Sequence, residues 1–225
     1  MNIECVIFDM DGVIIDSEIV SYEIIRDILE TMGHDLTIEE YAKTIGKNVA
    51  AVSAHYEQLV PDNHVRRNII AEYAEQYEDL VREGHQRIKP GVIELLNELD
   101  RLGLKRALAS SNTGYMVNLN LDTLGISGRF DALVFDGMVA HAKPFPDLFL
   151  KAAELTETSP ERCLVIEDSL AGVRAAHAAN IPVIVVPDII ELPSDALALC
   201  ERRCDNLLGV IDYLREQAEA CENQA

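Results

Sequence analysis

The stretch FDMDGVIIDSE (residues 8–18) decides how the rest of this sequence is interpreted. It begins where the apolar run Cys5–Phe8, which is typical of a buried strand, ends. The pair Asp11-Gly12, followed by apolar residues 13–15, is a common signal for a two-residue β-hairpin. A hairpin does not explain Asp9, because two carboxylates so close together repel each other unless a cation or a shared proton offsets their charge. The stretch alone leaves a turn and an active site equally open.

The composition is that of a globular protein without an obvious macromolecular partner. With 225 residues and 48% hydrophobic residues, the chain can form one large domain or a core with an insertion. Its formal net charge of −20 argues against nucleic acid as a partner, because phosphate backbones are bound by clustered lysine and arginine. No apolar run approaches the roughly 18 residues of a membrane span, so we expect no membrane partner. For the oligomeric state we expect a monomer or a dimer.

The cysteines and the first residues indicate where the protein is located. Five cysteines stand at positions 5, 163, 200, 204 and 221, and they form no Cys-x-x-Cys pair. We expect them to be reduced and mostly structural, and the protein to be cytoplasmic. Cys200 and Cys204 have a helical spacing, but without a second pair or a nearby histidine they make a weak zinc site. The first residues lack the charged and apolar segments of a targeting signal.

The pattern of apolar residues divides the chain into two parts. From Glu18 to Met32 apolar residues recur at helical spacing, and the sequence stays helical and polar to about residue 84, which predicts a helical insertion over residues 16–86. In the other part, residues 1–15 and 87–225, strands and helices alternate. The later strands are expected at 104–109, 132–135, 163–166 and 182–186, and the helices at 90–102, 114–124, 146–154, 169–180 and 206–220. This alternation predicts an α/β fold with a doubly wound parallel sheet.

Polar residues follow these strands at the edge where open α/β sheets bind their ligands. In chain order they are Asp9 and Asp11, then Ser110, Ser111 and Asn112, then Lys143 in the loop after residues 132–135, and finally Glu167 and Asp168. Each group alone has a structural explanation, since serine, asparagine and aspartate often cap helices and a loop lysine often lies in solvent. Together, however, they supply complementary parts of one reaction.

That reaction is phosphoryl transfer assisted by a metal ion. Asp9 and Asp168 offer hard oxygen ligands for Mg²⁺, which proteins usually hold with one or two carboxylates plus substrate phosphate and water. Ser110 and nearby backbone N–H groups can donate to phosphate oxygens, and Lys143 can act on the same group as a point charge. We therefore predict Mg²⁺ as the cofactor and a small phosphorylated metabolite as the partner.

Four segments, FDMDGVIIDSE, ALASSN, AKPFPD and VIEDSLAGVRAA, also occur in a characteristic order and spacing. They resemble the four motifs of the haloacid dehalogenase (HAD) superfamily, in its subgroup of β-phosphoglucomutase-like phosphatases, and the match spans the whole chain. The resemblance implies a Rossmann-like core with an all-helical cap inserted just after the first motif, where the composition places the insertion. It also implies Mg²⁺-dependent phosphoryl transfer through an aspartyl-phosphate.

The resemblance further implies roles for the acidic residues. These roles favour an active site over a hairpin turn in residues 8–18. Asp9 matches the family's nucleophile, and Asp11 matches its general acid and base. Alternate residues of an extended segment point the same way, so one carboxylate can attack phosphorus while the other reaches the leaving oxygen. Asp9, the backbone carbonyl of Asp11 and Asp168 match the Mg²⁺ ligands, and Glu167 matches a residue that orients metal-bound water.

The remaining motif residues match positions that contact the phosphate. Ser110 corresponds to the phosphate-binding hydroxyl of the second motif, and we place Ser111 and Asn112 beside it in the phosphate site. Lys143 corresponds to the lysine of the third motif, which pairs with Asp9 and with the phosphate.

Three functions remain compatible with these residues. We favour hydrolysis of a small phosphate monoester, such as a sugar phosphate, over a mutase of the β-phosphoglucomutase type, which returns the phosphoryl group to a sugar. The mutases of this subgroup carry an arginine in the cap loop where this chain has Val49, while the nearby Lys47 can contact a substrate. A phospho-receiver signalling module is the third alternative, and the helical insertion and the pair Glu167-Asp168 argue against it.

Overall fold

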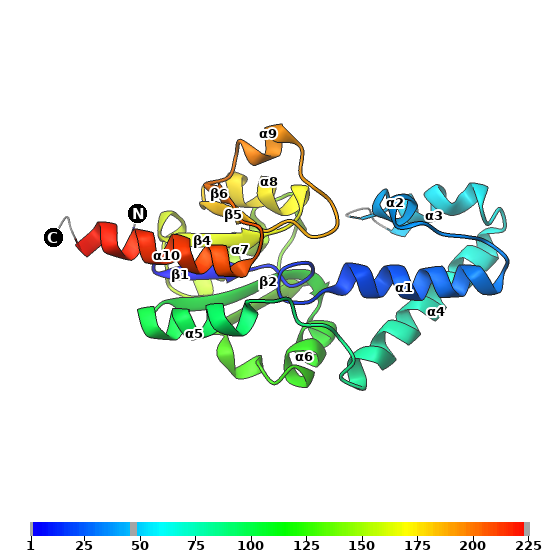
Figure 1. Cartoon of the computed structure of the whole chain (residues 1–225), viewed down its shortest axis with the longest axis horizontal. Helices are drawn as coiled ribbons and strands as arrows, with labels where there is room; N and C mark the ends of the chain where they lie inside the picture. The colour runs from blue at the N-terminus through cyan, green and yellow to red at the C-terminus, as the bar shows by residue number, and fades with distance from the viewer. Residues whose placement is uncertain (1, 46–48, 223–225) are drawn as a thin grey trace.

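Six parallel strands of the described residues form the sheet at the centre of the larger of two bodies (Figure 1). This computed structural model describes residues 2–45 and 49–222. The strands are β1 (Cys5–Phe8), β2 (Lys105–Thr113), β3 (Ala132–Asp136), β4 (Cys163–Glu167), β5 (Val183–Val185) and β6 (Arg202–Arg203), in the order β3-β2-β1-β4-β5-β6. The chain extends the sheet from β1 in both directions, so β1 and its neighbours form the switch point where such sheets bind ligands. The predicted doubly wound α/β fold is confirmed.

Alternate residues of β1 face two different helix layers. Val6 and Phe8 belong to a core that includes residues of α5 (Val92–Leu102), α6 (Gly114–Thr123) and α10 (Leu207–Glu222). Cys5 and Ile7 belong to a second core, with α7 (Asp147–Leu155), α8 (Leu170–Ala178) and α9 (Ser194–Leu197). Strands covered on both faces are apolar throughout, which explains the uninterrupted apolar run of β1. The polar residues therefore lie where the strands end, at the carboxyl edge of the sheet.

The second body consists of helices and lies beyond the carboxyl end of β1 (Figure 1). Its elements are α1 (Ser17–Thr31), α2 (Ile38–Ala42), α3 (Val49–His55), the 3₁₀ turn Tyr56–Gln58 and α4 (Asn63–Arg82). Residues Val20, Ile24 and Ile28 of α1 pack against the aromatic rings of Tyr73 and Tyr77 on α4. We call this body the cap, and its exact limits at residues 16 and 86 stay a prediction.

The two chain segments that join the cap to the sheet body are held together. The backbone N–H of Asp16 donates to the carbonyl of Arg87 at 2.8 Å, and that of Lys89 donates to the carbonyl of Ile14 at 2.8 Å. The Lys89 ammonium also forms an ion pair with Asp188 at 2.5 Å, in the loop after β5. The base of the cap is therefore attached to the sheet body at the edge where the strands end.

Apart from shifts of one or two residues at the ends of elements, the structure differs from the predicted elements in three places. β2 continues to Thr113 instead of ending at residue 109, so Ser110, Ser111 and Asn112 lie within the strand. Its pairing with β3 is irregular between Ala109 and Thr113, which is where the apolar pattern of the strand stops. The short elements α9 and β6 were not predicted, because four and two residues give no periodic signal.

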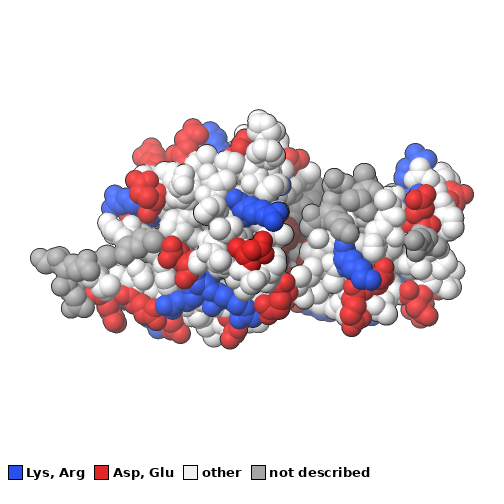
Figure 2. Space-filling view, turned by 90° about the horizontal axis from the view of Figure 1, so that it is seen from above, with Lys and Arg blue, Asp and Glu red and all other residues white. Residues whose placement is uncertain are grey.

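The surface carries both signs of charge in small groups on the face that Figure 2 shows, and this face is hollowed where the cap meets the sheet body. Among the described residues, no helix has the length and the apolar composition needed to cross a membrane. Cys5, Cys163, Cys200 and Cys204 are free thiols.

Candidate active site

β1 leads directly into a compact loop that carries both aspartates. The backbone N–H of Asp9 donates to the carbonyl of Ile166 at 3.0 Å, which ties the loop to the end of β4. Gly12 has a positive φ of 72°, and a Cβ there would lie 2.3 Å from Oδ2 of Asp168. The loop closes with a hydrogen bond from the N–H of Gly12 to the carbonyl of Ile15 at 2.9 Å. Asp11-Gly12 therefore forms a tight loop against Asp168, and not the turn of a two-stranded hairpin.

Lys143 connects the ends of β1 and β4 through two short hydrogen bonds. Its Nζ atom donates to Oδ1 of Asp9 and to Oε1 of Glu167, at 2.7 Å in each case. The Lys143 and Glu167 side chains are 6% and 0% exposed, and the ammonium lies 5.0 Å from the centre of the Phe149 ring. Burial alone would lower the pKa of Lys143, but the two carboxylates outweigh this effect and hold its pKa above the usual value. Lys143 is therefore a permanent positive charge in this site.

Glu167 is fixed by donors on both of its oxygens. Oε2 accepts hydrogen bonds from the backbone N–H groups of Asp168 and Ser169, at 3.0 and 2.9 Å, and from the Ser169 hydroxyl at 2.9 Å. A Cβ on Gly172 would lie 1.7 Å from Oε1, so only glycine leaves room for this side chain. The Ser169 hydroxyl also accepts from the N–H of Gly172 at 3.0 Å, which caps α8. Ser169 and Gly172 are supporting residues that the sequence analysis did not assign, although both belong to the segment VIEDSLAGVRAA.

Three carboxylates gather around this lysine. Asp9, Glu167 and Asp168 can each offer an oxygen such that all three atoms lie within 4.8 Å of one another. Burial raises the pKa of Asp9 to about 7, although the charge of Lys143 opposes the rise. Burial also raises the pKa of Asp168 well above its usual value, and the charge of Glu167 adds to this. When all three are ionised, the carboxylates carry more negative charge than one lysine can balance, and their hard oxygen donors are of the kind that Mg²⁺ prefers.

Asp11 belongs to the neighbouring part of the site and is not a member of this three-carboxylate group. Its Oδ2 accepts a hydrogen bond from the side-chain amide of Asn112 at 2.6 Å, and burial raises its pKa. Ser110 is fully buried, and its hydroxyl oxygen accepts from the backbone N–H of Asn112 at 3.0 Å. The Ser111 side chain is exposed. Of the predicted site residues, only Lys47 lies outside the described part of the chain.

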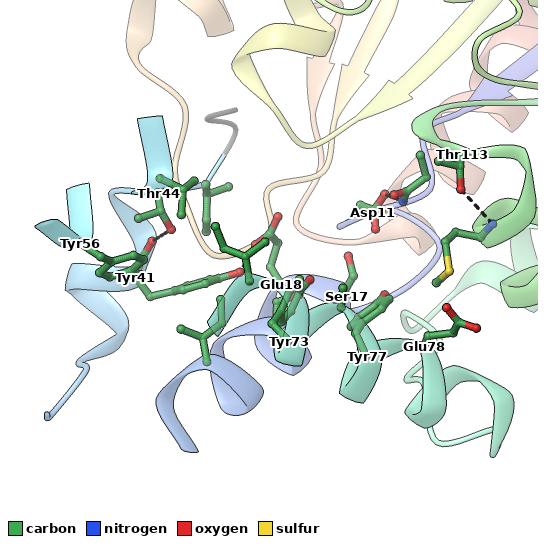
Figure 3. A pocket seen from close by; sticks show the side chains of 18 of the residues that line it. Asp11, Ser17, Glu18, Tyr41, Thr44, Tyr56, Tyr73, Tyr77, Glu78 and Thr113 are labelled. Carbon is green, nitrogen blue, oxygen red and sulfur yellow. Dashed lines mark hydrogen bonds between the residues drawn. The ribbon is translucent and has the colours of Figure 1, made fainter. Parts of the chain in front are cut away.

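A cavity of about 650 Å³ opens from Asp11 into the cap (Figure 3). One of its walls comes from α1 and α4, and Asn112 and Thr113 at the end of β2 line the same end as Asp11. In Figure 3 the side chains of Glu18 and Tyr73 lie between Asp11 and the far end of the cavity near Tyr56, and that of Tyr77 lies below Asp11. The cavity gives a substrate a place beside the carboxylates. No sequence pattern predicted this cavity, because its walls come from five segments with no common motif.

A family model described as "Haloacid dehalogenase-like hydrolase" matches residues 6–186. The chain belongs to the haloacid dehalogenase-like hydrolase family. The resemblance found in the four motifs is thereby confirmed, and the chain is a hydrolase of a family in which several relatives are named phosphatases. Membership of this family also removes the phospho-receiver alternative.

The relatives and solved structures of this family that are similar to the chain cover most of its length. It is 30% identical over 202 residues to the phosphorylated carbohydrates phosphatase of Thermotoga maritima, covering 88% of this chain and 90% of the relative. It is 30% identical over 182 residues to hexitol phosphatase B of Escherichia coli K12, covering 80% and 82%. A β-phosphoglucomutase structure from Clostridium difficile has a TM-score of 0.74 at 25% identity, covering 97% of this chain and 98% of that one.

One similar protein is much longer than this chain. The chain is 36% identical over 193 residues to SUPPRESSOR OF QUENCHING 1 of Arabidopsis thaliana, which covers 82% of this chain but only 18% of the plant protein.

Replacing Lys143 by methionine tests whether the lysine balances the buried carboxylates. Without it the pKa of Asp9 rises further above its unfolded value, and a carboxyl group with a raised folded pKa costs more stability as the pH increases. We expect the free energy of unfolding to fall by about 3 kcal/mol near pH 8 and by less near pH 5.5. Urea denaturation in EDTA at both pH values measures the difference.

The control is Lys151→Met, which removes a partly exposed lysine of α7 and should change stability little and equally at the two pH values. A deficit for Lys143→Met that is the same at pH 5.5 and pH 8 would contradict the charge-balancing role.

Proposed function

We propose that this hydrolase is a Mg²⁺-dependent phosphatase, which cleaves a small phosphate monoester through an aspartyl-phosphate on Asp9. The observation that carries the proposal is the position of Asp9: it is 7% exposed at the end of β1, and Lys143 donates to only one of its two oxygens. Among the described residues, none donates a hydrogen bond to Oδ2 of Asp9. That oxygen can attack phosphorus while Lys143 stabilises the charge on the carboxylate and on the phosphoryl group.

The first step forms the bond between Asp9 and phosphorus and breaks the ester bond to the alcohol. Asp11 gives its proton to the leaving oxygen, and the pKa of this partly buried carboxyl group, which desolvation raises, favours a protonated acid at the start. Asn112, which donates to Oδ2 of Asp11 at 2.6 Å, keeps this carboxyl group oriented.

The second step returns the enzyme to its starting state. Asp11, now ionised, takes a proton from water, whose oxygen attacks phosphorus and breaks the bond to Asp9. Inorganic phosphate leaves, Asp9 is again a carboxylate and Asp11 is again protonated. We assign Ser110, Ser111 and Asn112 to phosphate binding, because they lie together at the end of β2, next to β1, which leads into Asp9.

The residues suited to hold Mg²⁺ are Asp9, Asp168 and the backbone carbonyl of Asp11. When bound, the ion supplies positive charge that stabilises the transferring phosphoryl group. Glu167 already accepts hydrogen bonds on both oxygens, so we expect it to orient its neighbours and metal-bound water instead of binding the ion directly.

Phosphorylated carbohydrates are the substrate class we propose, since two relatives are named for phosphatase activity on phosphorylated carbohydrates and hexitols. The cap loop with Lys47 remains a candidate for contact with the substrate. A cytoplasmic location and a monomeric or dimeric state also stay predictions.

A mutase is the second candidate, because a β-phosphoglucomutase structure is similar to this chain. The two reactions share the phosphorylated aspartate and differ in the acceptor, which is water in one and a sugar phosphate in the other. Val49 stands where the mutases of the subgroup carry an arginine, which favours the phosphatase. Efficient formation of glucose 6-phosphate from β-glucose 1-phosphate, with a trace of glucose 1,6-bisphosphate and little free phosphate, would support the mutase instead.

Asp9→Asn tests the nucleophile. An amide is a poor nucleophile, so we expect release of phosphate from p-nitrophenyl phosphate and from a panel of sugar and hexitol phosphates to fall by more than about 10³-fold. The control is Asp122→Asn, which makes the same chemical change at an exposed position of α6 and should keep wild-type activity. Retention of more than a few per cent of activity by Asp9→Asn would remove Asp9 from this role.

The metal proposal is tested by binding as well as by activity. Mg²⁺ at about 100 times its dissociation constant should stabilise the folded enzyme by about 2.7 kcal/mol, measured as a rise in the melting temperature after EDTA treatment. Asp168→Asn should lose most of this rise and need more Mg²⁺ for activity, because one charged ligand is gone, whereas Asp122→Asn should behave as the wild type. An unchanged Mg²⁺ titration for Asp168→Asn counts against this site.

A further inference from the structure

The wall of the cavity is rich in tyrosine side chains, which the proposed reaction does not use. Five of the seven tyrosines of the chain line it: Tyr41, Tyr56, Tyr73, Tyr77 and Tyr115. Four of them come from the cap, and Tyr115 comes from α6 of the sheet body. Tyrosine rings offer flat apolar faces for the carbon skeleton of a ligand, while their hydroxyls can bind polar groups. The cavity is therefore suited to a molecule that has both.

The charges that line the cavity have one sign. Its described lining residues include Asp11, Glu18 and Glu78, and they include no lysine, arginine or histidine. Glu78 is balanced, because Oε1 accepts from Arg82 and from the hydroxyl of Tyr115, at 2.7 Å in both cases. Glu18 has no such cation in contact with it among the described residues. The part of the wall nearest to the reaction is therefore acidic.

Glu18 is oriented so that one of its oxygens remains available. It lies in the first turn of α1, and its Oε2 accepts a hydrogen bond from the Tyr41 hydroxyl at 2.7 Å. No hydrogen bond to its Oε1 is made by the described residues. Figure 3 shows Glu18 between Asp11 at one end of the cavity and Tyr41 at the other. A ligand that extends from the carboxylates into the cap must pass this side chain.

Burial affects which ligand groups can lie beside Glu18. It raises the pKa of Glu18, and the hydrogen bond from Tyr41 opposes that rise by favouring the ionised form. An anionic group beside this half-buried carboxylate, which has no cation in contact with it among the described residues, is repelled, because the surroundings screen the charges less than water does. A hydroxyl group is attracted instead, since a carboxylate oxygen accepts its proton in a charge-assisted hydrogen bond.

We propose that Glu18 determines which alcohol the enzyme releases: its free oxygen accepts a hydroxyl of the leaving group, and the tyrosine rings pack against that group's carbon skeleton. The leaving group is then an uncharged polyhydroxy alcohol, and esters whose alcohol carries a carboxylate or a second phosphate are rejected. The inference rests on the proposed phosphatase function and narrows its substrate class.

Two substrates that differ only at the end of the alcohol test this inference. Sorbitol 6-phosphate ends in a hydroxymethyl group where 6-phosphogluconate ends in a carboxylate. For the wild type we expect kcat/KM to be at least about 10-fold higher for sorbitol 6-phosphate, which corresponds to about 1.4 kcal/mol of discrimination. In Glu18→Gln this preference should fall at least about 5-fold, through a higher KM for the hexitol ester and a lower one for the sugar acid ester.

Glu30→Gln is the matched control, because it makes the same change at an exposed position of the same helix and should leave the preference intact. Tyr41→Phe, which frees Glu18 from its hydrogen-bond donor, should raise KM for sorbitol 6-phosphate several-fold.

The outcomes separate this inference from the proposed function. If the wild type releases no phosphate from p-nitrophenyl phosphate or from either ester, the phosphatase function itself is wrong. A wild type that hydrolyses p-nitrophenyl phosphate but prefers 6-phosphogluconate overturns the role of Glu18 alone. Equal losses on both esters in Glu18→Gln would also overturn it, because they would show a purely structural role.

Discussion

The buried ammonium of Lys143 is the constraint on which the rest of the site depends. It donates to Asp9 at the end of β1 and to Glu167 at the end of β4, and the structure places it on a loop that arrives from β3. Buried carboxylates without a partner cost several kcal/mol each, so this lysine permits two of them to lie side by side. The remaining excess of negative charge, with Asp168 nearby, is what makes a divalent cation a suitable further component.

The division of the chain into two bodies separates the reaction from the choice of substrate. The sheet body supplies the proposed nucleophile, acid, lysine and metal ligands from the ends of neighbouring strands, which parallel pairing brings to one edge. The cap supplies the tyrosines and Glu18, whose positions depend on helix packing and not on the sheet. A change in the cap can therefore alter which alcohol is accepted without disturbing the groups that act on phosphorus.

Much of the sheet body could be predicted from the sequence, because buried parallel strands are apolar runs and polar residues follow them at one edge. The cap could be predicted as helical, but its cavity could not, since Tyr41, Tyr73 and Tyr115 come from distant segments that line one cavity only after packing. The supporting contacts of Glu167 could not be predicted from the sequence either, because they depend on the close approach of Gly172. The end of β2 was misplaced, since the polar residues Ser110 to Asn112 continue a strand whose apolar pattern has stopped.

The central claim is that Asp9 carries the phosphoryl group during turnover. Asp11→Asn lacks the base that hydrolyses the intermediate but can still form it slowly from an ester with a good leaving group. The most direct test therefore incubates Asp11→Asn with Mg²⁺ and ³²P-labelled p-nitrophenyl phosphate, stops the reaction with acid and locates the label by peptide mapping. The account predicts label on the peptide that contains Asp9, and none in the double variant Asp9→Asn/Asp11→Asn. Label on another residue, or phosphate release by Asp11→Asn at the wild-type rate without any labelled protein, would contradict it.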